Sequence, residues 1–244
     1  MQRLSSIKVS ANIKVIMQLP DPVMGLNLMG LNLLYRGECD ANKTIFWVDG
    51  VMGSIACALS GVGVERKPGR IFLTEALKFI SKNYPDRPVI FMNDGKPLSE
   101  ITCLLGRRPS QIKLPWHEVK RDFETLSFAG VNSRCFVFIA IGSPKQEWLA
   151  QLIYTKTKAK CFCIGGAVNM LEKRENPAPR WVERCGLEWV YRLQNEPWRR
   201  AKRLVNSLYY GVRGLILSKR LTCVKIECPK SSPSDLTVHS REPE

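Results

Sequence analysis

The chain has 244 residues, 45% of them hydrophobic, which is long and apolar enough to bury a sizeable core and predicts a folded globular protein. Its formal net charge of +15 indicates an anionic partner such as phosphate, nucleic acid or membrane lipid, since self-repulsion works against a compact state. Nine cysteines without CxxC pairs argue against disulfides and structural zinc, and the absence of an h-region or an apolar run near roughly 18 residues argues against a secreted or membrane-spanning chain.

Short apolar runs alternate with helical patterns along the first two thirds of the chain. A helical pattern over residues 70–84 places Leu73, Ala76, Leu77 and Ile80 on one face with charges opposite, which predicts an amphipathic helix. Four runs rich in β-branched and aromatic residues end in Gly, Asp or Ser, as buried parallel strands do. They lie at residues 44–50, 88–95, 135–143 and 160–166.

These patterns predict an α/β fold with an open, mostly parallel Rossmann-like sheet flanked by helices, followed by a basic helical C-terminal appendage. The change of character comes after about Pro177, because residues 173–225 carry 13 Lys or Arg against four Glu. Proline, serine and charge dominate the last stretch, which has little to bury. We therefore expect an α/β catalytic domain at 1–176, the appendage at 177–227 and a disordered tail at 228–244.

Small and polar residues follow several predicted strands. Residues 142–148 read GSPKQEW, and the pairs or triplets at 49–50 (DG), 93–95 (NDG) and 165–166 (GG) also come at strand ends. Ligands of open parallel sheets bind at the carboxyl ends of the strands, so these loops are expected to form one rim around a shared cleft. Ordinary strand-to-helix turns would use the same residue types, and that alternative stays open.

Asp49 follows the run IFWV directly, which makes its carboxylate a candidate general base. Spacing alone favours a plainer role, in which Asp49 is a turn residue that caps the following helix. No Asp-x-Asp motif is present, and His117 and His239 lie far apart in the sequence, so a metal site is not expected.

The block LEWVYRLQNEPWRRAKRL at 187–204 concentrates guanidinium and ammonium groups. If the chain turns at Pro197, Arg192, Arg199, Lys202 and Arg203 converge as ligands for a diphosphate. Past this block, apolar residues at helical spacing over 204–224 favour a helix in an anionic membrane interface. A helix packed on the domain, or a segment that contacts nucleic-acid phosphates, remains an alternative.

Taken together and in order, these motifs resemble the WecG/TagA/CpsF family of bacterial glycosyltransferases over about residues 23–203. The resemblance rests on DG after a strand, IGSPKQEWLA, the GLEW at 186–189, and RL followed by EP and Arg at 192–199. Departures are also visible. Where the family has T-x-N, this chain has Gly25-Leu26-Asn27. The aspartate that is usual near the GG pair is replaced by Asn169, and Lys202 stands where another arginine is usual.

The resemblance implies a metal-independent, inverting hexosyltransferase without a cofactor. It would transfer a hexosyl, N-acetylhexosaminyl or uronic acid residue from a UDP-sugar to a polyprenyl-diphosphate-linked glycan in the assembly of exopolysaccharide, capsule or cell-wall polymer. The protein would be cytoplasmic and peripheral, on the anionic inner face of the cell membrane, with no nucleic-acid partner expected. Asp49 takes the place of the catalytic base, and the substrate-binding residues implied are Asn27, Arg66, Gln146, Arg192, Arg199, Lys202 and Arg203.

Two other classes of function stay open at this point. One is a non-catalytic binding protein that retains the fold, and the other is a basic nucleic-acid-binding protein that uses residues 192–225. Homo-oligomers are compatible with the apolar faces, although nothing in the sequence specifies a closed symmetry.

Overall fold

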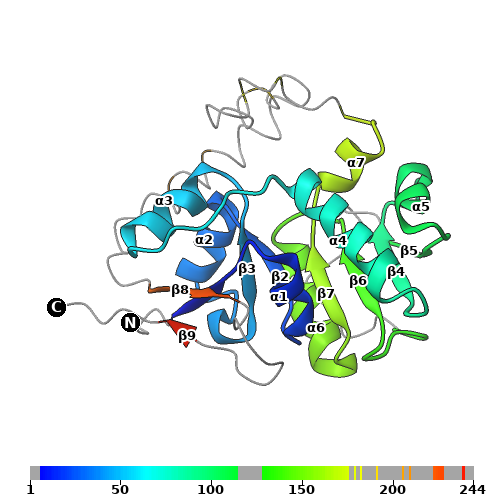
Figure 1. Ribbon diagram of the computed structural model, residues 1–244, viewed down its shortest axis with the longest axis horizontal. Helices are drawn as coiled ribbons and strands as arrows, with labels where there is room; N and C mark the ends of the chain where they lie inside the picture. Colours follow the sequence, from blue (N-terminus) through cyan, green and yellow to red (C-terminus); the bar gives the residue numbers. More distant parts are fainter. Residues whose placement is uncertain are drawn as a thin grey trace.

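The computed structural model describes residues 6–114, 128–175, 222–227 and 238–239, together with residues 179, 182, 191, 205 and 209. Within these residues nine strands form one sheet in the order β5-β4-β6-β7-β2-β3-β1-β8-β9 (Figure 1). Every neighbouring pair is parallel except β8 and β9, which are antiparallel. The strands are β1 Ile7–Val9, β2 Val23–Leu26, β3 Ile45–Val48, β4 Val89–Asn93, β5 Ser110–Lys113, β6 Phe136–Ile139, β7 Lys160–Cys163, β8 Cys223–Ile226 and β9 Val238–His239.

Helices cover both faces of this sheet. The predicted open, mostly parallel α/β sheet is therefore confirmed, and so are four predicted strands, which are β3, β4, β6 and β7. The amphipathic helix predicted at residues 70–84 is α4. The helices are α1 Ile13–Gln18, α2 Leu28–Tyr35, α3 Val51–Leu59, α4 Gly69–Asn83, α5 Ser99–Leu105, α6 Lys145–Thr157 and α7 Ala167–Leu171, with a short 3-10 helix η1 at Ala41–Lys43.

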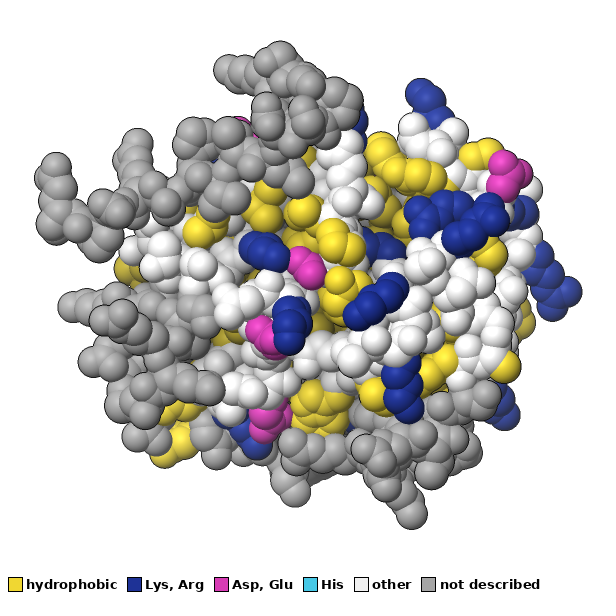
Figure 2. Space-filling model, turned by 90° about the horizontal axis from the view of Figure 1, so that it is seen from below, with side chains coloured by type: hydrophobic (Ala, Val, Ile, Leu, Met, Phe, Trp, Pro, Cys, Tyr) yellow, Lys and Arg dark blue, Asp and Glu magenta, His cyan; other side chains and the backbone are white. Residues whose placement is uncertain are grey.

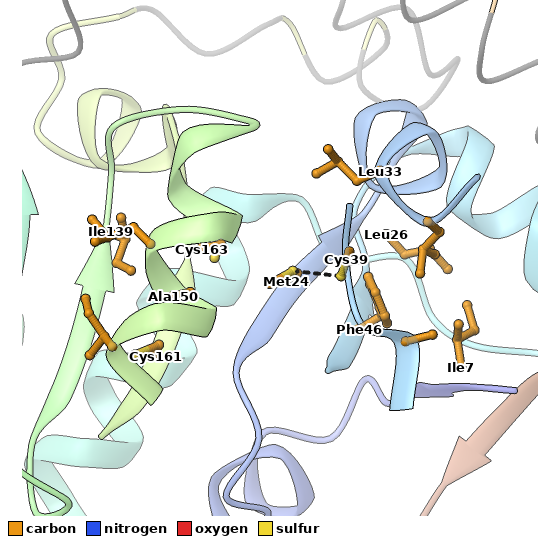
Figure 3. Close-up of a cluster of buried hydrophobic side chains, with 14 of the residues drawn as sticks. Ile7, Met24, Leu26, Leu33, Cys39, Phe46, Ile139, Ala150, Cys161 and Cys163 are labelled. Atoms are coloured by element: carbon orange, nitrogen blue, oxygen red, sulfur yellow. Dashed lines mark hydrogen bonds between the residues drawn. The ribbon is translucent and has the colours of Figure 1, made fainter. Parts of the chain in front are cut away.

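Successive side chains of each strand point to opposite faces of the sheet, and this divides the core into two layers. In β3, Phe46 and Val48 face the cluster that packs on α2, α3 and α6, whereas Ile45 and Trp47 face the cluster that packs on α1, α4, α5 and α7. Figure 3 shows part of the first layer, where the Sγ of Cys39 lies 3.6 Å from the Sδ of Met24. Because both faces are buried, the central strands are continuously apolar.

Aromatic side chains gather in the second layer. Trp47 stacks on Phe72 with ring centroids 4.1 Å apart, and Phe138 stacks on Phe91 at 4.9 Å and on Phe162 at 4.8 Å. These rings come from β3, α4, β4, β6 and β7, so one stack of aromatic contacts joins helix α4 to the middle of the sheet.

The C-terminal part of the chain returns to the sheet. Strand β8 pairs in parallel with β1, and Cys223, Val224 and Ile226 are buried there. These residues fall within the range predicted to be a helical appendage, and in the structure they extend the α/β sheet instead. Most of the predicted appendage and tail lies outside the described residues.

Basic side chains are spread over the surface. On the face seen in Figure 2, Lys and Arg side chains are scattered among polar and apolar ones, with fewer Asp and Glu between them. Among the described residues, no helix combines the length and the hydropathy that crossing a bilayer requires.

Candidate functional site

A polar cavity of about 230 Å³ lies at the carboxyl ends of four central strands, β6, β7, β2 and β3. Three of the predicted loops meet there, at residues 49–50, 142–148 and 165–166, whereas the loop at 93–95 does not line it. The lining residues are Gly25, Asn27, Met29, Trp47, Asp49, Gly69, Gly142, Ser143, Gln146, Glu147, Cys163, Ile164, Gly165, Gly166, Ala167 and Met170.

Asn27 holds Asp49 from the end of β2. The Asn27 Oδ1 caps helix α2 by accepting from the backbone N–H groups of Met29 and Gly30, at 3.0 and 3.1 Å. Its Nδ2 must then face the other way, and it donates to the Oδ2 of Asp49 at 3.1 Å. The helix cap therefore sets the orientation of the amide that contacts the carboxylate.

A second donor reaches Asp49 from the start of α4. The backbone N–H of Gly69 donates to the Oδ1 of Asp49 at 3.2 Å. Spacing in the sequence favoured Asp49 as the cap of the helix that follows it, which is α3. The N-cap of α3 is Gly50 instead, and it makes no side-chain cap bond. Both carboxylate oxygens of Asp49 thus accept a hydrogen bond from the protein, which fixes the orientation of the carboxylate.

Gln146 joins the ends of β6 and β7. Its Oε1 accepts from the backbone N–H of Gly165 at 2.9 Å. Its Nε2 donates to the Oε1 of Glu147 at 2.9 Å and to the Oγ of Ser143 at 3.1 Å, and the Ser143 hydroxyl also donates to Glu147. Both side chains are buried, at 5% exposed for Gln146 and 6% for Glu147. Since both Nε2 protons are engaged, Gln146 can offer a ligand only the second lone pair of its Oε1.

Cys163 also lines the cavity, at the end of β7. Burial raises the pKa of its thiol well above the ordinary value, and the nearby Glu147 carboxylate raises the pKa further. The thiol is therefore neutral near pH 7, and a neutral thiol is a poor nucleophile. Of the two carboxylates lining the cavity, Asp49 is the better placed for proton transfer, because its side chain is only partly buried whereas Glu147 is 6% exposed.

Gly25 and Trp47 form the cavity floor, and sequence reasoning did not identify Trp47. The two residues are partners in the register of β2 and β3. A Cβ on Gly25 would lie 3.2 Å from the Cζ2 of Trp47 and 3.1 Å from the Cβ of Asp49. The indole and the Asp49 side chain thus leave little room for a side chain at position 25. The pairing of a large with a very small residue across neighbouring strands was the signal in the sequence, but it requires knowing the strand order.

The remaining predicted site residues are not in this cavity or are not described. Arg66 lies in the loop between α3 and α4 and is not among the lining residues. Within the described part of the chain, no group of three or more His, Cys, Asp or Glu side chains could hold a metal ion. The predicted diphosphate ligands Arg192, Arg199, Lys202 and Arg203 lie outside the described residues.

Comparison with known proteins finds similarity to a curated relative and to a family model. The chain is 36% identical over 77 residues to the N-acetylglucosaminyldiphosphoundecaprenol N-acetyl-beta-D-mannosaminyltransferase of Bacillus subtilis (strain 168). That stretch covers 31% of this chain and 30% of the relative's length. Residues 132–222 match the family model described as Glycosyl transferase WecG/TagA/CpsF family, a range that contains the Gln146 side of the cavity and not Asn27 or Asp49. Residues 132–222 are thus similar to the Glycosyl transferase WecG/TagA/CpsF family, and this chain spans less than a third of the relative's length.

Proposed function

We propose that this protein is an inverting, metal-independent glycosyltransferase that moves a sugar from a UDP-sugar to a polyprenyl-diphosphate-linked acceptor. The observation that carries the proposal is the Asp49 carboxylate, which two donors hold at the wall of a polar cavity at the centre of a parallel sheet. The relative's name supports an acceptor in which N-acetylglucosamine is linked through diphosphate to undecaprenol, and this chain would use an acceptor of that class.

In the proposed reaction, Asp49 accepts the proton of the acceptor hydroxyl while the hydroxyl oxygen attacks the anomeric carbon of the donor sugar. The bond from that carbon to the diphosphate breaks, and UDP leaves with the bonding electrons from the opposite face. Negative charge grows on the departing diphosphate, which fixed cations would stabilise. Arg192, Arg199, Lys202 and Arg203 are the proposed cations, with Arg66 as a further contact from the α3–α4 loop.

The role of Asp49 is tested by replacing it with asparagine, which keeps the shape and removes the proton acceptor. We expect turnover to fall by at least about 10²-fold, as is typical when a general base is lost. Asp94→Asn is the matched control, because Asp94 also follows a strand of the sheet but does not line the cavity, and it should keep turnover within about twofold.

The assay combines the purified protein, a panel of UDP-sugars and a short-chain diphosphate-linked N-acetylglucosamine, with EDTA present and mass spectrometry as the readout. A gain of one sugar by the acceptor would support metal-independent transfer and identify the donor. Near-normal turnover of the Asp49→Asn variant would remove Asp49 from the role of base. UDP binding without transfer from any donor would favour a binding protein that retains the fold.

A further inference from the structure

Helix α3 has an outer face that is apolar and open to solvent. Val51, Ile55 and Leu59 are 38%, 40% and 65% exposed, and they recur every four residues together with exposed Ala58. We call these four residues the α3 stripe. It runs about 12 Å along the helix at 1.5 Å per residue.

The composition of α3 is unusual for a surface helix. Its sequence VMGSIACAL contains no charged residue, and its one hydroxyl, that of Ser54, donates to the backbone oxygen of Gly50. The inner face of α3 is already packed, because Gly53, Ala56 and Cys57 are buried against the sheet. Helix α4, by contrast, buries one face and presents charged residues on the other. A helix that is apolar all round is expected where both faces meet apolar material.

The α3 stripe begins beside the proposed catalytic residue. Val51 is separated from Asp49 by Gly50 alone, so the stripe leads away from the cavity toward the far end of α3, and Figure 1 shows α3 on the outside of the helical layer next to α2. A further exposed aliphatic residue, Ile71 at 40%, lies two residues after Gly69, whose N–H contacts Asp49. Among the described residues, three of the six large apolar side chains that are exposed belong to α3, and the others are Ile71, Val205 and Tyr209.

This inference rests on the proposed function. An acceptor of the proposed class joins a sugar, through a charged diphosphate, to a long hydrocarbon chain. Its reactive hydroxyl must reach Asp49, and its hydrocarbon must leave the polar cavity over an apolar surface. We propose that the first isoprenoid units of the acceptor lie along the α3 stripe, which makes Ile55 and Leu59 contact residues for the lipid.

The test compares two acceptors that differ only in their lipid. Both carry N-acetylglucosamine diphosphate. One has a full polyprenyl chain and is presented in phosphatidylglycerol vesicles, and the other has a short, water-soluble alkyl chain. In the variant Ile55→Gln/Leu59→Gln, which leaves the charge unchanged, we expect KM for the polyprenyl acceptor to rise at least about tenfold. For the short-chain acceptor, KM and kcat should stay within about twofold of the unsubstituted protein.

Several outcomes would overturn the inference. Equal losses on the two acceptors would mean that the substitutions disturb the cavity, and no loss on either would mean that the lipid lies elsewhere. Val205→Gln tests the other exposed aliphatic position, and a selective loss there without one on α3 would also refute the role of the stripe. If the double variant does not fold, Leu59→Gln alone gives the same comparison at the most exposed position of the stripe. An unsubstituted protein inactive on both acceptors would refute the proposed function itself.

Discussion

Lys160 is a buried cation at the start of β7, at the end of the strand away from the cavity. Its Nζ donates to the backbone oxygens of Leu19 and Asp21, both at 2.7 Å, and so ties the segment before β2 to β7. Burial lowers the pKa of Lys160 from 10.5 to about 7, although the Asp21 carboxylate works in the opposite direction. In the unfolded chain this lysine regains its ordinary pKa.

The sign of the pH dependence follows from the difference in bound protons. Between pH 7 and about 10 the unfolded state holds the Lys160 proton more firmly than the folded state, so this lysine makes stability rise with pH. Relative to Lys160→Met, the free energy of unfolding of the unsubstituted protein should therefore increase across this window, by roughly 1 kcal/mol per pH unit at most.

Urea unfolding at pH 7, 8 and 9 measures this change. Lys82→Met, on the exposed side of α4, should give a difference that does not vary with pH. A pH-independent difference for Lys160→Met as well would show that the buried amine does not titrate in this range.

The contact between α3 and β2 is set by a glycine. A Cβ added to Gly53 would lie only 1.9 Å from the backbone oxygen of Leu26, so α3 packs against β2 more closely than any side chain permits. Helix α2 packs closely in the same way, because a Cβ added to Gly30 would lie 2.6 Å from the backbone oxygen of Gly25. Asn27 and Asp49 directly follow the paired residues Leu26 and Val48, so the register of β2 and β3 brings their side chains within hydrogen-bonding distance.

Gly53→Ala should destabilise the protein by about 2 kcal/mol or more, because the helix must move away from backbone atoms that cannot yield. Gly63→Ala is the matched control, since a Cβ there meets nothing within 4 Å, and its effect should be neutral or slightly stabilising. Thermal unfolding of the two variants gives the comparison. Equal midpoints would mean that α3 shifts at little cost.

Strand β8, near the end of the chain, joins the sheet beside β1, near its start, so the stability of the sheet depends on residues far apart in the sequence. The Oγ of Ser10 donates to the backbone oxygen of Ile226 across 216 positions of the chain. A protein that ends after residue 221 would lose Cys223, Val224 and Ile226 from the core. At about 2 kcal/mol for each of the buried aliphatic side chains Val224 and Ile226, its stability should fall by roughly 4 kcal/mol.

A chain that ends at residue 227 provides the control, because it keeps β8 and, of the elements that the structure describes, removes β9 alone. Denaturant midpoints of the two shortened chains and the full chain would show the difference. Should the chain ending at 221 unfold at the same midpoint as the one ending at 227, β8 would contribute nothing to the sheet's stability.

The local pattern of apolar residues was sufficient to locate four strands of the sheet and helix α4 in the sequence. Strands β3, β4, β6 and β7 are continuous apolar runs, and α4 has a clear helical period, so their positions and the α/β class followed from the sequence. Asp49 and the 142–148 loop could be placed at strand ends for the same reason. Strand β1 is three residues long and β5 is largely exposed, so local pattern does not distinguish them from loops.

The sequence by itself determined the fold class, the family resemblance and the position of Asp49 after a buried strand, because each depends on residues that are neighbours in the chain. Only the tertiary structure decided that Asn27 and Gly69 hold Asp49, that Trp47 packs beside Gly25, that the loop at 93–95 stays out of the cavity, and that β8 joins β1. These features depend on strand order and on contacts across many residues, which are set by packing over the whole sheet rather than by local propensity.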